Sequence, residues 1–355
     1  MWIDQLTFRW YPNFFVVIVA DPGVVSKTTT MDLGMKLLRR VPGVHFGPSV
    51  VTWQALVKRF AEARDAFEWP PGSTRFVMQS ALTLAAGEFG NLVNPAERET
   101  IDLYVSLWDC STGVMEKLTK TAGQDKVENP YLNMIACTTP AWIAGTFPDY
   151  VVGGGFISRC LLVYAEKKSK LVAYPSRHIP PGYAERSDKL VEDLTHISQL
   201  IGEYQISEDA VAWGEEWYAL LWNNKPVELS DDRFKTYLAR KQTHIHKVAM
   251  VLAASQGDEL VIQRDHLFMA NKMVSDLEVE MPKVFAKIGR TEESIQADRF
   301  IKLVQKNGRM SYGAAYQYVH SAFPGFKDFE NVVAGAIRAG FLRLEGDTLV
   351  AVEHK

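Results

Sequence analysis

The segment from Phe14 to Arg40 constrains the fold more than any other part of the sequence. Phe14–Ala20 is a continuous apolar run rich in β-branched residues, which is typical of a strand buried on both faces of a parallel sheet. Lys27–Arg40 carries apolar residues at helical spacing, and Pro22 and Gly23 lie between the two segments. The sequence therefore predicts a core strand that turns through a short loop into a helix.

The loop between these segments fits part of the phosphate-loop pattern GxxxxGK[ST]. Lys27 and Thr28 match the pattern, whereas Asp21 and Ser26 replace its two glycines and Gly23 lies inside the loop. If the loop needs a positive φ at the replaced positions, Asp and Ser would tolerate it less well than glycine, and nucleotide affinity and hydrolysis would suffer. The alternative is a strand–turn–helix in which Lys27 only marks a solvated helix start.

A phosphate loop would bind ATP and Mg²⁺ through its backbone and two side chains. Backbone N–H groups around the loop and at the helix start would point at the phosphates. Lys27 would neutralise charge on the β- and γ-phosphates, and the Thr28 hydroxyl would bind Mg²⁺. The candidate nucleotide-binding residues are Asp21, Pro22, Gly23, Val24, Val25, Ser26, Lys27, Thr28 and Thr29.

Two polar residues follow or end other apolar runs that the sequence predicts to be core strands. Glu88 comes just after the run Ser80–Ala86, where a carboxylate could hold Mg²⁺ through water or orient the attacking water. Thr138 ends the run Leu132–Thr138 and could sense the γ-phosphate. Both have structural alternatives, because Glu88 could be a helix cap or a surface residue, and Thr138 could belong to the cap of a helix that starts at Pro140.

Arg159 is the third candidate catalytic residue. It follows a loop that contains Gly153, Gly154 and Gly155, and it begins an apolar run that ends at Ala165. An arginine in this position could stabilise transition-state charge on a phosphate of its own subunit or of a neighbouring one. An ordinary surface ion pair is the alternative.

Two groups of basic residues are candidates for nucleic-acid binding. Arg240 and Lys247 share one face of a predicted helix with His244, although a solvated helix face is the commoner explanation of such a pattern. Lys117 and Lys120 lie in a polar stretch that could line a central pore and touch a nucleic-acid backbone. Acidic residues lie near these two lysines, which weakens that interpretation.

The pattern of apolar residues divides the chain into five parts and places it in the α/β class. Alternation of strands and helices predicts a mostly parallel sheet in the second part, including a helix over Trp53–Phe67 that Thr52 caps. The last part has three helical segments and a hairpin, as in a winged helix. The parts are a lead-in (1–13), an α/β core (14–168), a linker (169–182), a helical lid or oligomerisation subdomain (183–290) and a winged-helix-like domain (291–355).

Composition excludes several classes of protein. The formal net charge of −3 is close to neutral, so bulk charge does not indicate a nucleic-acid binder. Cys110, Cys137 and Cys160 are widely spaced and form no CxxC pair, which predicts reduced thiols rather than a zinc site or a disulfide framework. The sequence shows neither a signal peptide nor a membrane span, and we expect a cytoplasmic protein with no membrane partner.

An ordered series of short motifs resembles the P-loop ATPases of phages and integrated mobile elements, of the type associated with primases and helicases. The loop at 20–29 is followed by Phe46-Gly47-Pro48-Ser49, Ala86-Gly87-Glu88-Phe89-Gly90, Thr138-Thr139-Pro140-Ala141-Trp142 and Gly153-Gly154-Gly155-Phe156-Ile157-Ser158-Arg159. The similarity covers roughly residues 14–290. Lys27, Thr28, Glu88 and Arg159 match the nucleotide-binding lysine and threonine, the acidic residue and the arginine of that family.

The resemblance implies a RecA- or AAA-like core that uses ATP and Mg²⁺ to move on single-stranded or duplex DNA as a hexamer-like ring, beside a primase or another replication protein. A second hypothesis is a protein without motor activity, in which the altered loop holds nucleotide or nothing and the chain acts as a structural or loading partner. A third is transcriptional regulation through the winged-helix-like part, where basic and acidic residues balance.

Overall fold

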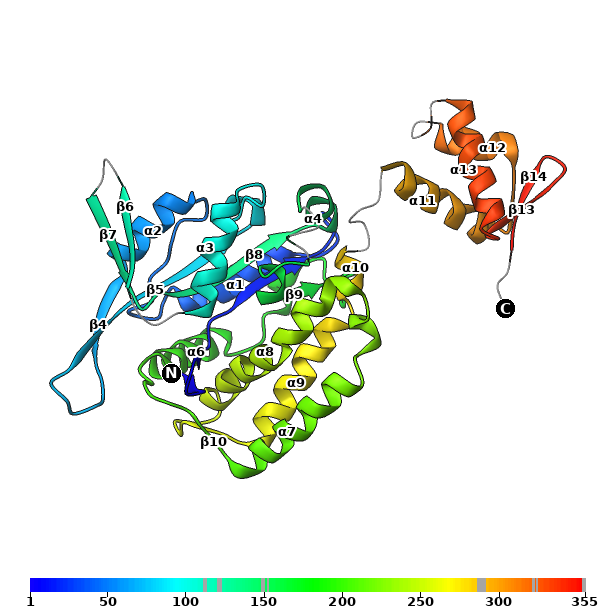
Figure 1. Cartoon of the computed structure of the whole chain (residues 1–355). Helices are drawn as coiled ribbons and strands as arrows, with labels where there is room; N and C mark the ends of the chain where they lie inside the picture. Colours follow the sequence, from blue (N-terminus) through cyan, green and yellow to red (C-terminus); the bar gives the residue numbers. More distant parts are fainter. Residues whose placement is uncertain are drawn as a thin grey trace. The chain divides into compact units, whose positions relative to one another are not determined.

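The computed structural model describes residues 1–110, 114–119, 123–147, 151, 153–285, 292–320, 323 and 325–352. The chain forms two compact units, Met1–Ala286 and Lys287–Lys355, which we describe separately (Figure 1). The first unit contains a mixed, mostly parallel sheet of five strands, so the predicted α/β class is confirmed. The helices of the described residues all fall short of the length or the apolar character that a bilayer-spanning segment requires.

The central sheet has the strand order β4-β5-β8-β3-β9. Strands β5, β8, β3 and β9 are parallel to one another, and β4 pairs antiparallel with β5 at one edge. The first parallel strand of the chain, β3, therefore lies inside the sheet, between two strands that come much later in the sequence. The strands are β3 (Phe15–Val19), β4 (Arg64–Glu68), β5 (Phe76–Ala86), β8 (Tyr131–Thr138) and β9 (Cys160–Tyr164).

The apolar run of β3 is buried because both faces of the sheet are covered. Phe15, Val17 and Val19 point to one face and are at most 1% exposed, and Phe15 contacts the rings of Tyr104 and Phe156 there. On the other face, Ile18 and neighbouring β-strand side chains pack against Met31 and Met35 of the helix α1 (Lys27–Leu38). Alternate residues of one strand thus serve two apolar layers, as the sequence predicted.

Helices connect the strands of the sheet, and two of them begin at threonine caps. Thr52 Oγ1 accepts a hydrogen bond from Ala55 N–H, and Thr139 Oγ1 accepts one from Trp142 N–H ahead of Pro140. The connecting elements are α1, α2 (Trp53–Glu62), η1 (Phe89–Asn91), α3 (Arg98–Asp109), α4 (Pro140–Thr146) and η2 (Ile157–Arg159).

Two hairpins depart from the sequence predictions. The helix predicted to reach Phe67 ends at Glu62, because the polar residues 64–68 pair with 76–80 as the antiparallel strands β4 and β5. The polar stretch that was expected to be a loop contains the strands β6 (Val114–Thr119) and β7 (Gly123–Glu128), which pair antiparallel. In both places, pairing between neighbouring segments satisfies the backbone of a sequence with little apolar periodicity.

A helical layer completes the first unit. Helices α8 and α9 pack together and against the edge strand β9 and the turn that precedes it, and α7 packs on α9 (Figure 1). The predicted lead-in belongs to this layer, because Ile3 and Trp10 are buried in the same apolar cluster as α8 and α9. The elements are β1 (Ile3–Asp4), β2 (Arg9–Trp10), η3 (Pro175–His178), α6 (Tyr183–Ser198), β10 (Gln205–Ile206), α7 (Glu208–Asn223), η4 (Val227–Leu229), η5 (Asp232–Phe234), α8 (Lys235–Ala254), β11 (Val261–Ile262), α9 (Arg264–Glu278) and α10 (Met281–Phe285).

In its described residues, the second unit has three helices and a three-stranded antiparallel sheet with the order β12-β14-β13. Phe300, Phe329 and Leu349 are fully buried and link the helices to the sheet in one apolar core. The predicted hairpin is confirmed as β13 and β14, whereas the function of this unit stays a prediction. The elements are α11 (Glu292–Asn307), β12 (Arg309–Ser311), α12 (Tyr312–Val319), α13 (Phe326–Arg338), β13 (Leu342–Glu345) and β14 (Thr348–Ala351).

Candidate functional site

A cavity of about 330 Å³ lies at the carboxyl ends of β3, β5 and β8, and we call it the carboxyl-edge cavity. It brings together candidate residues that the sequence places in three separate segments. In a sheet of this kind, ligands bind outside the carboxyl ends of the strands where the strand order reverses. The lining residues are Pro22, Gly23, Val25, Ser26, Lys27, Thr28, Thr29, Gly87, Glu88, Thr138 and Thr139.

The loop between β3 and α1, residues 20–26, has a left-handed backbone at Gly23, where φ is +73°. Ser26 has a φ of −85°, and Asp21 is not among the described residues with a positive φ. The two residues that replace the pattern glycines are therefore free of the strain expected for them. The glycine of this loop, Gly23, therefore occupies the position at which the backbone has a positive φ.

The first turn of α1 presents backbone N–H groups at the cavity. Lys27, Thr28 and Thr29 are the first residues of the helix, so their N–H groups have no acceptor within it. The Ser26 side chain does not cap these groups, and Thr28 and Thr29 are exposed. Together with the positive end of the helix dipole, these donors favour an anion in the cavity.

The Lys27 side chain folds back over the loop. Its Nζ donates a hydrogen bond to the backbone oxygen of Ala20 at 2.7 Å and lies 3.4 Å from that of Asp21. Among the described residues, no carboxylate forms an ion pair with Lys27. A ligand phosphate could therefore attract this ammonium group away from two neutral carbonyls without breaking an ion pair.

Oxygen donors from three segments lie around the same cavity. Glu88 is exposed two residues after the end of β5, Thr28 is exposed on α1, and Thr138 is buried at the end of β8. Hydroxyl and carboxylate oxygens are suitable ligands for Mg²⁺ or for its water shell, so Thr28 and Glu88 fit this ion. Thr139 also lines the cavity, although its hydroxyl already caps α4.

Cys137 lies below the cavity, on the face of the sheet that packs against α1. Burial raises the pKa of its thiol, and the nearby Thr28 hydroxyl and Lys27 ammonium group act in the opposite direction. Like Cys110 and Cys160, Cys137 is a free cysteine and is buried. The Thr28 side chain therefore stands between the cavity and the apolar layer under α1.

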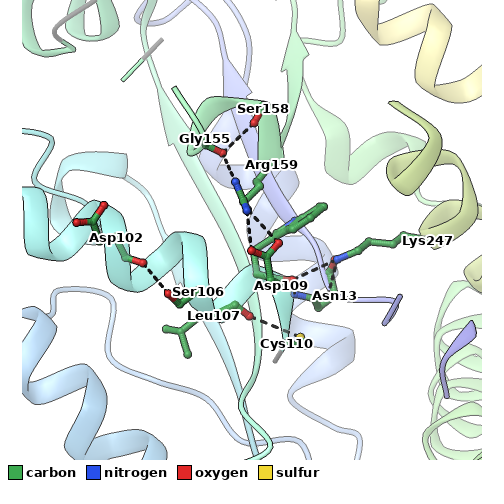
Figure 2. A network of polar contacts seen from close by, with 11 residues as sticks. Asn13, Asp102, Ser106, Leu107, Asp109, Cys110, Gly155, Ser158, Arg159 and Lys247 are labelled. Carbon is green, nitrogen blue, oxygen red and sulfur yellow. Dashed lines mark hydrogen bonds and ion pairs between the residues drawn. The ribbon is translucent and has the colours of Figure 1, made fainter. Parts of the chain in front are cut away.

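The structure places Arg159 away from the carboxyl-edge cavity of its own chain. This residue lies at the amino end of β9, next to Phe15, whereas the loop of Lys27 follows the carboxyl end of β3. A strand of this length separates the two by about 16 Å. The Arg159 side chain is 6% exposed, pairs with Asp109 at 2.6 Å and donates to the Gly155 backbone oxygen at 2.7 Å (Figure 2). Within the described part of the chain, these contacts hold the Arg159 side chain at the end of the sheet opposite to the carboxyl-edge cavity.

Lys247, a candidate for nucleic-acid contact, is buried in the structure. Lys247 is 2% exposed and donates to Asn13 Oδ1 at 2.6 Å and to the Asn13 backbone oxygen at 3.2 Å (Figure 2). Its Nζ lies 3.6 Å from the centre of the Trp108 ring. Burial lowers the pKa of Lys247 to about 7. The predicted basic face of α8 is thus packed against the amino end of the sheet.

The other two residues of that face of α8, His244 and Arg240, are also buried or half-buried. His244 is 1% exposed, its Nε2 lies 2.9 Å from the Ser158 backbone oxygen, and burial lowers its pKa to about 3. Arg240 is half-buried, and burial, followed by the nearby Arg159, lowers its pKa. The structure therefore does not bring Arg240 and Lys247 to a common exposed surface. We call Asn13, Trp108, Asp109, Arg159 and Lys247 the amino-edge network.

One of the two remaining nucleic-acid candidates lies in the β6–β7 hairpin. Lys117 is on β6, opposite Asp125 of β7, and Lys120 lies outside the described residues. The lysine at the base of this hairpin, Lys126, pairs with Glu128 at 2.7 Å. The prediction for Lys117 and Lys120 remains untested.

Sequence reasoning did not single out Gly87 or Thr139, which also line the cavity. Gly87 lies between β5 and Glu88, and a Cβ atom at this position would lie 3.5 Å from Thr28 Cγ2. A small residue directly before the acidic candidate was the available signal, because close approach of a strand end to a helix start favours glycine.

No protein-family model matches the sequence, and a search of curated proteins finds no match. The functional assignment therefore depends on the geometry of the cavity and on the residues that line it.

Proposed function

We propose that the chain binds a magnesium–nucleoside triphosphate, with ATP as the first candidate, in the carboxyl-edge cavity and hydrolyses it. The observation that carries the proposal is the convergence of Lys27, Thr28 and Glu88 on one cavity from two different strand ends. An ammonium group, a hydroxyl beside a helix start and a carboxylate are the groups that phosphoryl transfer needs.

Each residue would have a separate task. The N–H groups at the start of α1 and the Lys27 ammonium group would hold the β- and γ-phosphates. Thr28 would bind Mg²⁺, which when present neutralises charge on those phosphates. Glu88 would orient a water molecule for attack on the γ-phosphate, since its exposed carboxylate has access to solvent in the cavity. Thr138 would donate a hydrogen bond to the transferred phosphate.

Titration calorimetry with Mg-ATP tests the binding step. We expect heat of association for the wild-type chain and at least a tenfold loss of affinity for Lys27→Ala, because the variant lacks the cation that faces the phosphates. Lys58→Ala, which removes an exposed lysine from α2, is the matched control and should bind as wild type. Absence of binding by the wild-type chain at high protein concentration would overturn the proposal.

Hydrolysis is tested separately with Glu88→Gln. This variant should bind Mg-ATP within about twofold of the wild type and release phosphate at least tenfold more slowly, because the amide cannot accept a proton from water. Equal phosphate release by the two proteins would remove Glu88 from the reaction. A matched assay with single-stranded DNA examines the motor hypothesis, which requires the DNA to stimulate turnover.

Movement on DNA and assembly into a ring remain proposals that rest on the resemblance of the sequence motifs. The residues first considered for DNA contact do not strengthen them, since Lys247 is buried and Arg240 is half-buried. The binder without motor activity is the alternative, and a wild-type chain that binds Mg-ATP without turning it over would favour it.

A further inference from the structure

A second cavity, of about 350 Å³, lies beside α1, and we call it the α1 groove. It shares Thr28 and Gly87 with the carboxyl-edge cavity, so the two spaces meet at these residues. The volume is within the range of sites for small organic ligands. The lining residues are Thr28, Met31, Asp32, Met35, Lys36, Arg39, Ser49, Ala85 and Gly87.

The groove combines an apolar floor with a cationic end. Met31 and Met35 are buried under α1 beside Ala85 of β5, and flexible thioethers adapt well to a planar apolar ligand. Lys36 and Arg39 are exposed on the last turns of the helix. This arrangement suits a ligand that has an apolar body and a negative charge at one end.

The two cations are available to a ligand. Within the described ranges, neither Lys36 nor Arg39 forms an ion pair, and the Arg39 guanidinium lies 4.7 Å from the centre of the Phe46 ring. The next residue differs, because Arg40 pairs with Asp188 of α6. Stacking against Phe46 fixes the plane of the Arg39 guanidinium and leaves its N–H groups free to hold an anion.

The positions along α1 set the direction of the ligand. Thr28 and Arg39 are eleven residues apart on the helix, which corresponds to about 16 Å. A negative group at Lys36 and Arg39 would therefore stay away from the nucleotide phosphates, whereas the other end of the ligand would reach Thr28 and Gly87. Asp32, which lies between the two ends, disfavours a second negative charge in the middle of the groove.

We propose that the α1 groove binds a small organic phosphate monoester as a second ligand, with its phosphate at Lys36 and Arg39 and its apolar body on Met31 and Met35. The site goes beyond the proposed function and relies on it only for the identity of the neighbour at Thr28. Because the cavities share Thr28 and Gly87, the nucleotide and the second ligand would be in contact or nearly so.

The test uses the full chain saturated with a non-hydrolysable magnesium–ATP analogue, and 1-naphthyl phosphate as the probe in titration calorimetry. We expect the probe to bind with a single site and 1-naphthol, which lacks the phosphate, to bind at least tenfold more weakly. The double variant Lys36→Ala, Arg39→Ala should lose at least tenfold in probe affinity. Arg40→Ala is the matched control and should bind the probe as wild type, because Arg40 is paired with Asp188.

Three results would overturn the inference: equal binding of 1-naphthyl phosphate and 1-naphthol, unchanged affinity in the double variant, and binding of an oligonucleotide but not of the probe. The third result would indicate a nucleic-acid surface instead. Lys27→Ala separates this inference from the proposed function, because the variant should lose the ATP analogue and still bind the probe. If the wild-type chain fails to bind the analogue but binds the probe in a manner that depends on Arg39, only the proposed function fails.

Discussion

The two ends of the central sheet each hold a lysine whose ammonium group donates to a backbone oxygen, and the two lysines differ in what else can reach them. At the carboxyl end, Lys27 is half-buried, lines a cavity and donates to carbonyls of its own loop. At the amino end, Lys247 is 2% exposed and is enclosed by Asn13 and Trp108. From this comparison we infer that a lysine can bind a ligand only if its ammonium group is accessible and interacts weakly with the rest of the protein.

The arginines and carboxylates repeat this contrast. Arg159 and Asp109 join the start of β9 to the end of α3, and with Lys247 they connect the sheet to the helical layer. Glu88 lies at the opposite end, exposed beside the cavity. We infer that the amino-edge network holds the first unit together, whereas the carboxyl edge is left open for chemistry.

The largest expected effect is the loss of stability in Arg159→Ala. The change removes an ion pair with Asp109, a hydrogen bond to Gly155 and the contact with the Trp108 ring. Because Asp109 is 46% exposed, water can partly solvate its carboxylate, and we expect a loss of about 3 kcal/mol in the free energy of unfolding. Urea unfolding measures this loss.

Arg98→Ala, which removes an exposed pair with Asp102, is the control and should change stability by less than about 0.5 kcal/mol. Mg-ATP affinity of folded Arg159→Ala should stay within about twofold of the wild type. If Arg159→Ala kept its stability and lost ATP turnover, the contrast between the two ends of the sheet would be wrong. Arg159 would then act on a phosphate, in its own subunit or in a neighbour.

The next effect is a dependence of stability on pH that comes from Lys247. Its pKa is about 7 in the folded chain, below the ordinary value of 10.5, because of burial. Between these values the unfolded chain binds a proton that the folded chain lacks, so stability should rise with pH, by about 2 kcal/mol from pH 7 to pH 9. Burial raises the pKa of the adjacent Cys110 to about 12, so that thiol stays neutral in this range.

The measurement is urea unfolding of wild type and Lys247→Met at several values of pH. The difference between the two stabilities removes the contribution of other groups that titrate in the same range. We expect this difference to change with pH in favour of the wild type as pH rises. Parallel curves would mean that Lys247 is as accessible to water as Lys27, and the contrast between the two ends of the sheet would disappear.

These contrasts show why the sequence predicted one end of the sheet better than the other. The strand before Lys27 and the helix after it are encoded by a local apolar run and local helical spacing, and Glu88 and Thr138 follow from the ends of similar runs. The position of the Arg159 side chain depends on its contact with Asp109, which lies fifty residues earlier in the chain. The position of the Lys247 side chain depends on its hydrogen bond to Asn13, which is 234 residues away in the chain. Local sequence patterns carry no information on contacts between residues so far apart in the chain. The sequence alone therefore could not distinguish a buried cation from an accessible one.

The smallest expected effect concerns the loop beside Lys27 and decides which of its residues shape it. Gly23→Ala places a Cβ in open space, but φ at this position is +73°, so the strain is confined to the backbone. We expect a loss of about 1 kcal/mol in the free energy of unfolding and a fall of several-fold in Mg-ATP affinity. Thermal unfolding and titration calorimetry measure the two quantities.

Ser26→Gly is the matched change, since it restores a glycine of the phosphate-loop pattern. Ser26 has a φ of −85° and its side chain caps no N–H group, so glycine should lower stability by only a few tenths of a kcal/mol and leave Mg-ATP affinity within about twofold. A tenfold gain in affinity for Ser26→Gly, with no effect of Gly23→Ala, would show that the absent pattern glycine limits this loop. Lys27 would then be poorly placed to bind a phosphate although it is accessible. In that case the lysines at both ends of the sheet, Lys27 and Lys247, would be unable to bind a ligand.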